Sequence, residues 1–113
     1  MVIVVTESGI DQSKTATILV HGLLGIQPFA RNFEIKEACY GATAAMDYAK
    51  LHIEKHPDSK VLVLASDIAK YGIHTPGEPT QGAGAISMLI SSNPRILAFN
   101  DDNVAQTRDV MDF

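Results

Sequence analysis

The sequence predicts an α/β fold with a mostly parallel sheet, and three observations support this. Residues 2–6 and 61–65 are apolar runs rich in β-branched residues, typical of strands buried on both faces. Residues 8–24 and 39–55 are longer segments that follow the first and second predicted strands, and their apolar residues have helical spacing. Strands that alternate with helices favour parallel pairing, because each helix carries the chain back along the sheet.

The first strand is followed by a predicted helix over residues 8–24. Ser8 is suited to cap its N-terminus, and Gly25 and Pro28 follow its end. Residues 32–38 then predict a short strand, because apolar and charged residues alternate there.

A second helix is expected from about Cys39 to Lys55, and a turn at residues 57–59 ends it. The next buried strand leads into residues 67–84, which are rich in Gly, Pro and Thr. We expect a long loop there, and loops of that length are usually functional. Two more strands are expected over residues 85–90 and 95–99. A chain of 113 residues suits a single domain.

The composition excludes several classes of protein. Apolar residues make up 46% and charged residues 19%, which argues against disorder. A net charge of −4 argues against nucleic acid as the main partner, because phosphate binding needs clustered Lys and Arg. The first residues lack a signal-peptide pattern, and no apolar run is long enough to span a bilayer. A single cysteine excludes a disulfide within the chain and suits a reducing cytoplasm.

Candidate functional residues follow three of the predicted strands. The strands deliver Glu7, Cys39 and Asp67 at their carboxyl ends, where open α/β sheets bind ligands. If the strands are parallel, these residues and the 67–84 loop open on one edge of the sheet.

Cys39 is the predicted nucleophile. Free N–H groups and the dipole at a helix N-terminus favour an anion, and the thiolate is the attacking species in acyl transfer. The same N–H groups are able to stabilise an oxyanion, and the small neighbours Ala38 and Gly41 allow a substrate close approach. Two plainer interpretations stay open. Cys39 is then a small buried apolar residue, and Glu7 is an acid in the first turn of a helix, where the helix dipole stabilises negative charge.

The remaining polar residues give weaker signals. Tyr71 and Thr80 lie in the predicted loop, as ligand contacts or as turn residues. No metal site is predicted, because one cysteine and scattered histidines lack ligand spacing. The histidines are expected to be structural, surface or loop residues: His21, His52, His56 and His74.

Five segments resemble bacterial-type 3-hydroxy-3-methylglutaryl-CoA synthases (hydroxymethylglutaryl-CoA synthases) of the thiolase superfamily. Residues 34–43, EIKEACYGAT, are similar to the nucleophile motif, and Thr6-Glu7-Ser8 to the general acid/base segment. Residues 64–71 and 75–85 resemble the acyl-CoA-lining loop, and residues 103–109 also match.

The resemblance implies a three-layer α/β/α thiolase-like half-domain with a mixed, mostly parallel sheet. Residues 1–113 would be one partial N-terminal domain, without the first strand of that half and without the second half. It also implies a cytoplasmic homodimer.

The implied activity is that of an acyltransferase of the mevalonate pathway, which leads to isoprenoids. Cys39 would take an acetyl group from acetyl-CoA, and Glu7 would act as the base in its condensation with acetoacetyl-CoA. By resemblance Thr80 contacts substrate, Tyr71 lines the pocket and Ala38 shapes the cavity. Coenzyme A thioesters are the substrates, and no other cofactor or metal is implied.

The chain also departs from the family pattern. No histidine matches the family residue that polarises the acetoacetyl carbonyl, and the basic residues that grip CoA phosphates are not found. We therefore expect this chain to fold but to lack turnover by itself. Two alternatives stay open: another thiolase-like condensing enzyme, such as a ketoacyl synthase, and a non-catalytic half-thiolase dimerisation module.

Overall fold

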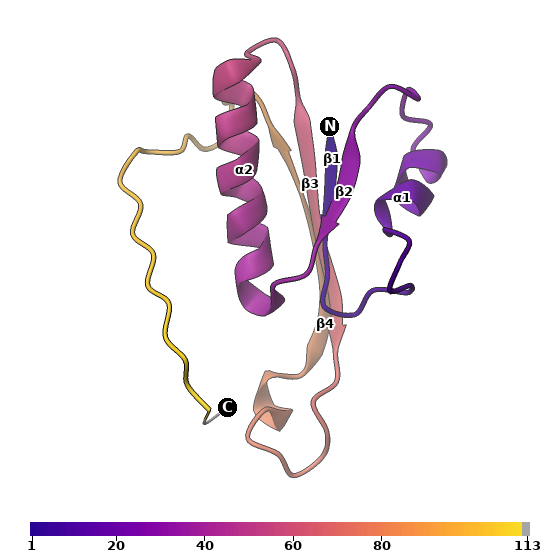
Figure 1. The fold of residues 1–113 in the computed structure, drawn as a ribbon, viewed down its shortest axis with the longest axis vertical. Helices are drawn as coiled ribbons and strands as arrows, with labels where there is room; N and C mark the ends of the chain where they lie inside the picture. Colours follow the sequence, from indigo (N-terminus) through magenta and orange to yellow (C-terminus); the bar gives the residue numbers. More distant parts are fainter. Residues whose placement is uncertain (112–113) are drawn as a thin grey trace.

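The computed structural model describes residues 1–111 and contains a four-stranded mixed sheet between two helices (Figure 1). The strand order is β2-β1-β3-β4, and β1 pairs in parallel with both β2 and β3, whereas β4 is antiparallel to β3. The predicted α/β class with a mostly parallel sheet is confirmed. The strands are β1 (Val2–Val5), β2 (Asn32–Ile35), β3 (Val61–Ala69) and β4 (Gly82–Ile90).

The helices lie on opposite faces of the sheet and complete three layers. Figure 1 shows α2 (Gly41–Lys55) along one face and the shorter α1 (Thr17–Leu23) against the other. The side of α2 that meets the sheet carries Ala45, Ala49 and Ile53, all buried and spaced by one helical turn. Small residues allow this helix to lie close to the strands. None of the helices among residues 1–111 has the length and apolar character needed to cross a bilayer.

Strand β1 occupies the centre of the sheet, and all of its residues are buried. It carries only valine and isoleucine, so both of its faces are covered by apolar packing, as the sequence predicts. Its register places Val5 beside Ile35 on β2 and beside Ala65 on β3. The carboxyl ends of these three neighbouring strands therefore point the same way.

The first helix differs from its prediction. It begins at Thr17, so the N-cap role predicted for Ser8 is wrong. The Ser8 hydroxyl instead donates to Asp67 on β3, at 2.9 Å, so it is not available to cap a helix. The carboxylate of Asp11 accepts the backbone N–H groups of Ser13 and Lys14, which holds residues 9–16 in a compact turn. The strand predicted over residues 32–38 ends at Ile35.

The third strand is longer than predicted. β3 continues through Asp67 to Ala69 and pairs with the start of β4, so a hairpin with a connection at 70–81 replaces the long loop predicted over 67–84. The small residues at 82–85 allow this extended pairing despite weak strand propensity. Figure 1 shows the connection projecting beyond the other strands, with a short 3₁₀ turn, η2 (Glu78–Thr80).

The strand predicted over residues 95–99 is wrong. This segment is irregular and pairs with no strand in the described part of the chain, and Ile96 is 93% exposed. Apolar residues alone do not make a strand when no neighbouring edge supplies backbone hydrogen bonds. Two side-chain contacts join the residues just after this segment to α2, from Lys50 to Asp101 at 2.7 Å and from Asn103 to Asp47 at 3.1 Å.

Gly41, the first residue of α2, tests the close packing of this helix on β1. A Cβ atom at Gly41 would lie 2.5 Å from Cγ1 of Val5. We expect Gly41→Ala to lower the free energy of unfolding by about 1–3 kcal/mol, measured by urea denaturation, because the added methyl overpacks this contact.

Two variants separate this contact from a general effect of glycine replacement. Val5→Ala removes the opposing methyl, so it should cost less in the Gly41→Ala background than in the wild type. Gly22→Ala in α1 meets no atom within 4 Å and should not destabilise the chain. Wild-type stability of Gly41→Ala would contradict the predicted packing.

Candidate active site

Three candidate site residues follow the carboxyl ends of β1, β2 and β3. Glu7 follows β1, Cys39 follows β2, and Tyr71 follows β3. The parallel pairing of β1 with both neighbours brings these segments to one edge of the sheet, as the topology predicts. Glu7 lies well before the start of α1, so its interpretation as a first-turn acid of that helix is wrong.

Glu7 and Tyr71 are joined by a short hydrogen bond. The phenol of Tyr71 donates to Oε1 of Glu7 at 2.5 Å. This bond is the main cause that raises the pKa of Tyr71 to about 12, followed by burial and by the charges of Glu7, Cys39 and Asp67. The phenol therefore stays protonated at neutral pH and remains a donor. Cys39 lies at the same edge of the sheet, because β2, which precedes it, pairs in parallel with β1.

Cys39 is exposed and lies in a 3₁₀ turn, η1 (Ala38–Tyr40), directly before α2. The interpretation of Cys39 as a small buried residue is therefore wrong. The preceding residue, Ala38, has a φ of 39°, a left-handed conformation that costs a non-glycine residue roughly 1 kcal/mol or more. This strained turn carries the chain from β2 into the helix and leaves the thiol accessible to a substrate.

Two backbone N–H groups that follow Cys39 form hydrogen bonds within the turn. The N–H groups of Tyr40 and Gly41 both donate to the carbonyl of Glu37, at 3.0 and 3.1 Å. In this conformation these two groups do not serve an oxyanion, contrary to the role expected for N–H groups at the helix start.

The sequence predicted that Asp67 lies at the carboxyl end of a strand, but it assigned no function to this residue. Its Oδ1 accepts four hydrogen bonds from the segment that carries Glu7. The donors are the Thr6 hydroxyl at 2.8 Å, the Glu7 N–H at 2.7 Å, and the N–H and hydroxyl of Ser8 at 3.1 and 2.9 Å. The signal in the sequence was a pair of hydroxyl residues flanking Glu7.

These hydrogen bonds keep Asp67 ionised. Partial burial by itself would raise the pKa of this carboxyl, but the hydrogen bonds from Thr6, Ser8 and the backbone outweigh it and hold the pKa below its usual value. The charged carboxylate thus anchors the Glu7 segment to β3.

Thr80 occupies a different position from the other predicted site residues. Its hydroxyl donates to the carbonyl of Gly77 at 2.7 Å, and no hydrogen bond joins it to Glu7 or Cys39 within the described residues. A Cβ atom at Gly77 would lie 3.0 Å from the Cβ of Tyr71, so this glycine packs directly on the tyrosine. The link from Thr80 to Glu7 therefore runs through Gly77 and Tyr71.

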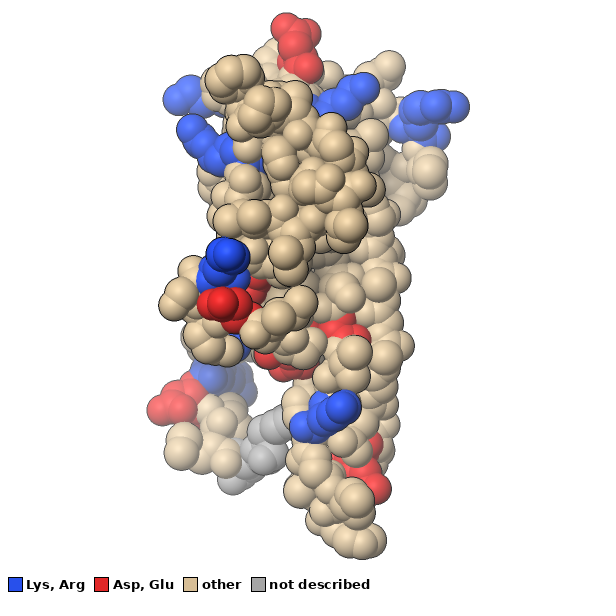
Figure 2. Space-filling view, turned by 90° about the vertical axis from the view of Figure 1, so that its right-hand side faces the viewer, with Lys and Arg blue, Asp and Glu red and all other residues tan. Residues whose placement is uncertain are grey.

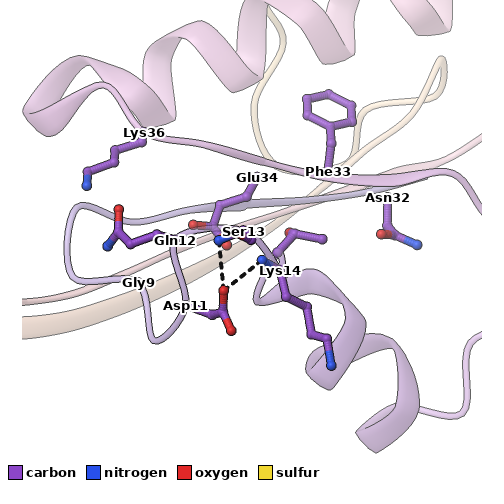
Figure 3. A pocket seen from close by; sticks show the side chains of 10 residues that line it. Gly9, Asp11, Gln12, Ser13, Lys14, Asn32, Phe33, Glu34 and Lys36 are labelled. Carbon is purple, nitrogen blue, oxygen red and sulfur yellow. Dashed lines mark hydrogen bonds between the residues drawn. The ribbon is translucent and has the colours of Figure 1, made fainter.

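A hollow with a volume of about 360 Å³ is formed by the turn before α1 and by β2. In Figure 3, Asp11 accepts hydrogen bonds at its base, and Lys14 and Lys36 extend away from one another. Neither Glu7 nor Cys39 lines this hollow, so it is separate from the predicted catalytic residues.

The face of the molecule that bears α1 carries charges of both signs. Figure 2 shows that basic and acidic side chains are scattered over this face and form no continuous basic patch on it.

A family model described as the N-terminal part of hydroxymethylglutaryl-coenzyme A synthase matches residues 1–95. The chain belongs to the hydroxymethylglutaryl-CoA synthase family. The hydroxymethylglutaryl-CoA synthase of Enterococcus faecalis is 66% identical over 113 residues, which are 100% of this chain and 30% of that protein. A Bacillus subtilis protein, the polyketide biosynthesis 3-hydroxy-3-methylglutaryl-ACP synthase PksG, is 37% identical over 85% of this chain and 26% of its own length.

Solved structures of this family agree with the fold. A crystal structure of an HMG-CoA synthase complexed with CoA superposes with a TM-score of 0.92 and 70% identity, over 99% of this chain and 29% of that chain. The thiolase-like α/β fold expected from the resemblance is therefore confirmed. The chain spans about 30% of the length of the E. faecalis relative.

Asp67→Asn tests the anchor of the Glu7 segment. Because the folded-state pKa of Asp67 is depressed, its stabilisation is fully present above the unfolded pKa, about 3.9, and is lost as the pH falls through the folded pKa. We expect Asp67→Asn to lower stability by about 1 kcal/mol at neutral pH, at the low end for hydrogen bonds to a charged group. Urea denaturation at several pH values should show the difference vanish in acid.

Asp101→Asn is the matched control. It removes an exposed carboxylate that pairs with Lys50, and such surface pairs contribute little. Equal effects of the two substitutions at neutral pH would rule out a special role for Asp67.

Proposed function

We propose that a protein containing this chain is a hydroxymethylglutaryl-CoA synthase, an acyltransferase of the mevalonate pathway that condenses acetyl-CoA with acetoacetyl-CoA. The observation that carries the proposal is an exposed thiol, Cys39, at the same sheet edge as the hydrogen-bonded pair of Glu7 and Tyr71. The identity of 66% with the E. faecalis enzyme supports the choice of reaction.

The reaction begins with acyl transfer. The thiolate of Cys39 attacks the thioester carbonyl of acetyl-CoA, the bond to the CoA sulfur breaks, and CoA leaves as a thiol after it takes a proton. Glu7 then removes a proton from the acetyl methyl group. The resulting carbanion equivalent attacks the ketone of acetoacetyl-CoA, and the new alkoxide takes a proton. Water finally cleaves the thioester to Cys39, which releases 3-hydroxy-3-methylglutaryl-CoA and the free thiol.

The hydrogen bond from Tyr71 suits a carboxylate acting as this base. It occupies Oε1 of Glu7, so Oε2 is the oxygen left to take the methyl proton. We assign Tyr71 to the pocket lining beside Glu7. Ala38 would shape the cavity next to the thiol, and Thr80 would contact substrate from the loop. Coenzyme A thioesters supply all the acyl groups, and the steps above use no metal or other cofactor.

No histidine of the chain, His74 in the loop included, matches the family residue that polarises the acetoacetyl carbonyl. His52 and His56 also lie at the end of α2 opposite to Cys39, and His21 bonds to a neighbouring carbonyl. For this reason we propose that the chain by itself does not turn over, and that the remaining groups come from elsewhere in the full protein.

A second candidate donor is an acyl carrier protein. The B. subtilis relative is named as an HMG-ACP synthase, and a Curacin-pathway HMG synthase structure with holo donor-ACP is 39% identical over 83% of this chain. The higher identity to the CoA-dependent relative favours acetyl-CoA as donor here.

We also propose that the protein is a homodimer in the cytoplasm. Support for association comes from the sheet, whose outer strands β2 and β4 have no partner on their outer edges among residues 1–111. The nine residues of β4 carry no charge that would discourage pairing with another chain. Light scattering after size exclusion should give the mass of a dimer, and a monomer at all concentrations would count against it. A free thiol suits a reducing compartment.

Acetylation of Cys39 is the direct test of the proposed function. After incubation of the chain with acetyl-CoA, mass spectrometry should find one acetyl group on the peptide that contains Cys39. Cys39→Ala should abolish the adduct. Glu7→Gln should keep it, because Glu7 acts after acyl transfer, but should slow deuterium exchange of the acetyl methyl group on the order of a hundredfold or more.

The possible results separate the competing functions. A folded chain without any adduct would support the non-catalytic dimerisation module. Faster acetylation by an acetylated carrier protein than by acetyl-CoA would favour the carrier-dependent synthase or a ketoacyl synthase. Product from acetyl-CoA and acetoacetyl-CoA with this chain alone would overturn the expectation that it is incomplete.

A further inference from the structure

His52 and His56 form a pair of rings at the C-terminal end of α2. They are separated by one helical turn, and their ring centroids lie 4.8 Å apart with an interplanar angle of 42°. His56 is the residue that ends the helix, and its N–H donates to the carbonyl of His52 at 2.9 Å. Because Cys39 precedes the other end of α2, a 15-residue helix about 22 Å long separates the two features.

The ring nitrogens of this pair are available for other contacts. Within residues 1–111 neither ring makes a hydrogen bond, whereas Nε2 of His21 lies 3.0 Å from the carbonyl oxygen of Gln27. His52 is half-buried and His56 is exposed, so a ligand can approach from solvent. Burial lowers the pKa of His52, and the charge of His56 lowers it further.

We propose that His52 and His56 bind a divalent transition-metal ion such as Zn²⁺ or Ni²⁺. Histidines four residues apart on one helix face are able to bind one metal ion together, and imidazole nitrogen is a favoured ligand of these metals. The negative end of the helix dipole also favours a cation at this position. No set of three potential ligands occurs among the described residues, so water or a second molecule completes the coordination.

Two nearby positive charges oppose the ion. The N-terminal ammonium of Met1 and the guanidinium of Arg31 both contribute positive potential at His52, which weakens attraction of a cation. Chelation by two rings must outweigh this repulsion, so the affinity should depend on both histidines and not on either alone.

Zinc titration of the Cys39→Ser variant tests the proposal, because this background removes a thiol that would itself bind zinc. Calorimetry at about pH 7.5 should show one zinc ion per chain, and binding should be weaker at about pH 5.5, because protons compete with metal ions for ligand nitrogens. His52→Ala and His56→Ala should each weaken binding on the order of tenfold or more. Zinc should also raise the unfolding temperature of the parent but not of these two variants.

His21→Ala and His74→Ala are the matched controls and should bind zinc as the parent does. Zinc binding that survives both His52→Ala and His56→Ala would overturn the proposal, and so would an equal loss in His21→Ala. If His52→Ala unfolds, the exposed position of His56 makes His56→Ala the deciding variant. The result is independent of the proposed synthase reaction, since no step of that reaction uses these histidines.

Discussion

The arrangement of this molecule depends on the burial of β1 between two parallel neighbours. Every residue of Val2–Val5 is buried, and pairing on both sides aligns the strand with β2 and β3. A slip of one residue would turn every side chain of a neighbouring strand to the opposite face of the sheet. Apolar packing of β1 on both faces therefore sets the register, and the register brings Glu7 and Cys39 to the same edge.

Asp67 holds Glu7 in a defined position at this edge of the sheet. The chain leaves β1 at Thr6 and forms no helix until Thr17, so nothing in secondary structure fixes Glu7. Four hydrogen bonds to one oxygen of Asp67 tie the segment down from the side of β3, and the hydroxyl of Tyr71 holds the Glu7 carboxylate itself. Both anchors come from the part of β3 beyond Ala65 and the residues after it.

Local pattern was sufficient for the buried strands and for α2, because β-branched runs and helical spacing of small residues act within a few positions. Ser8 illustrates where local reasoning fails. By sequence, the Ser8 hydroxyl is suited to cap a helix. In the structure it donates instead to Asp67, which is distant along the chain. The extension of β3 and the irregular path of residues 95–99 also escape local reasoning, because each depends on whether the segment pairs with another strand. Recognition of Glu7 and Cys39 as a pair required parallel topology, and their roles required the family resemblance.

The strained turn at Ala38 and the glycine at 41 together place Cys39, the proposed nucleophile. A left-handed residue redirects the chain after β2, so that Cys39 stays exposed while α2 returns across the sheet. The helix then begins with a glycine because Val5 of the central strand leaves no room for a side chain. The thiol is thus held close to the strand that delivers Glu7. A greater distance between α2 and β1 would relieve the close packing of Gly41 on Val5. It would also move the Cys39 thiol away from Glu7, the base of the proposed condensation.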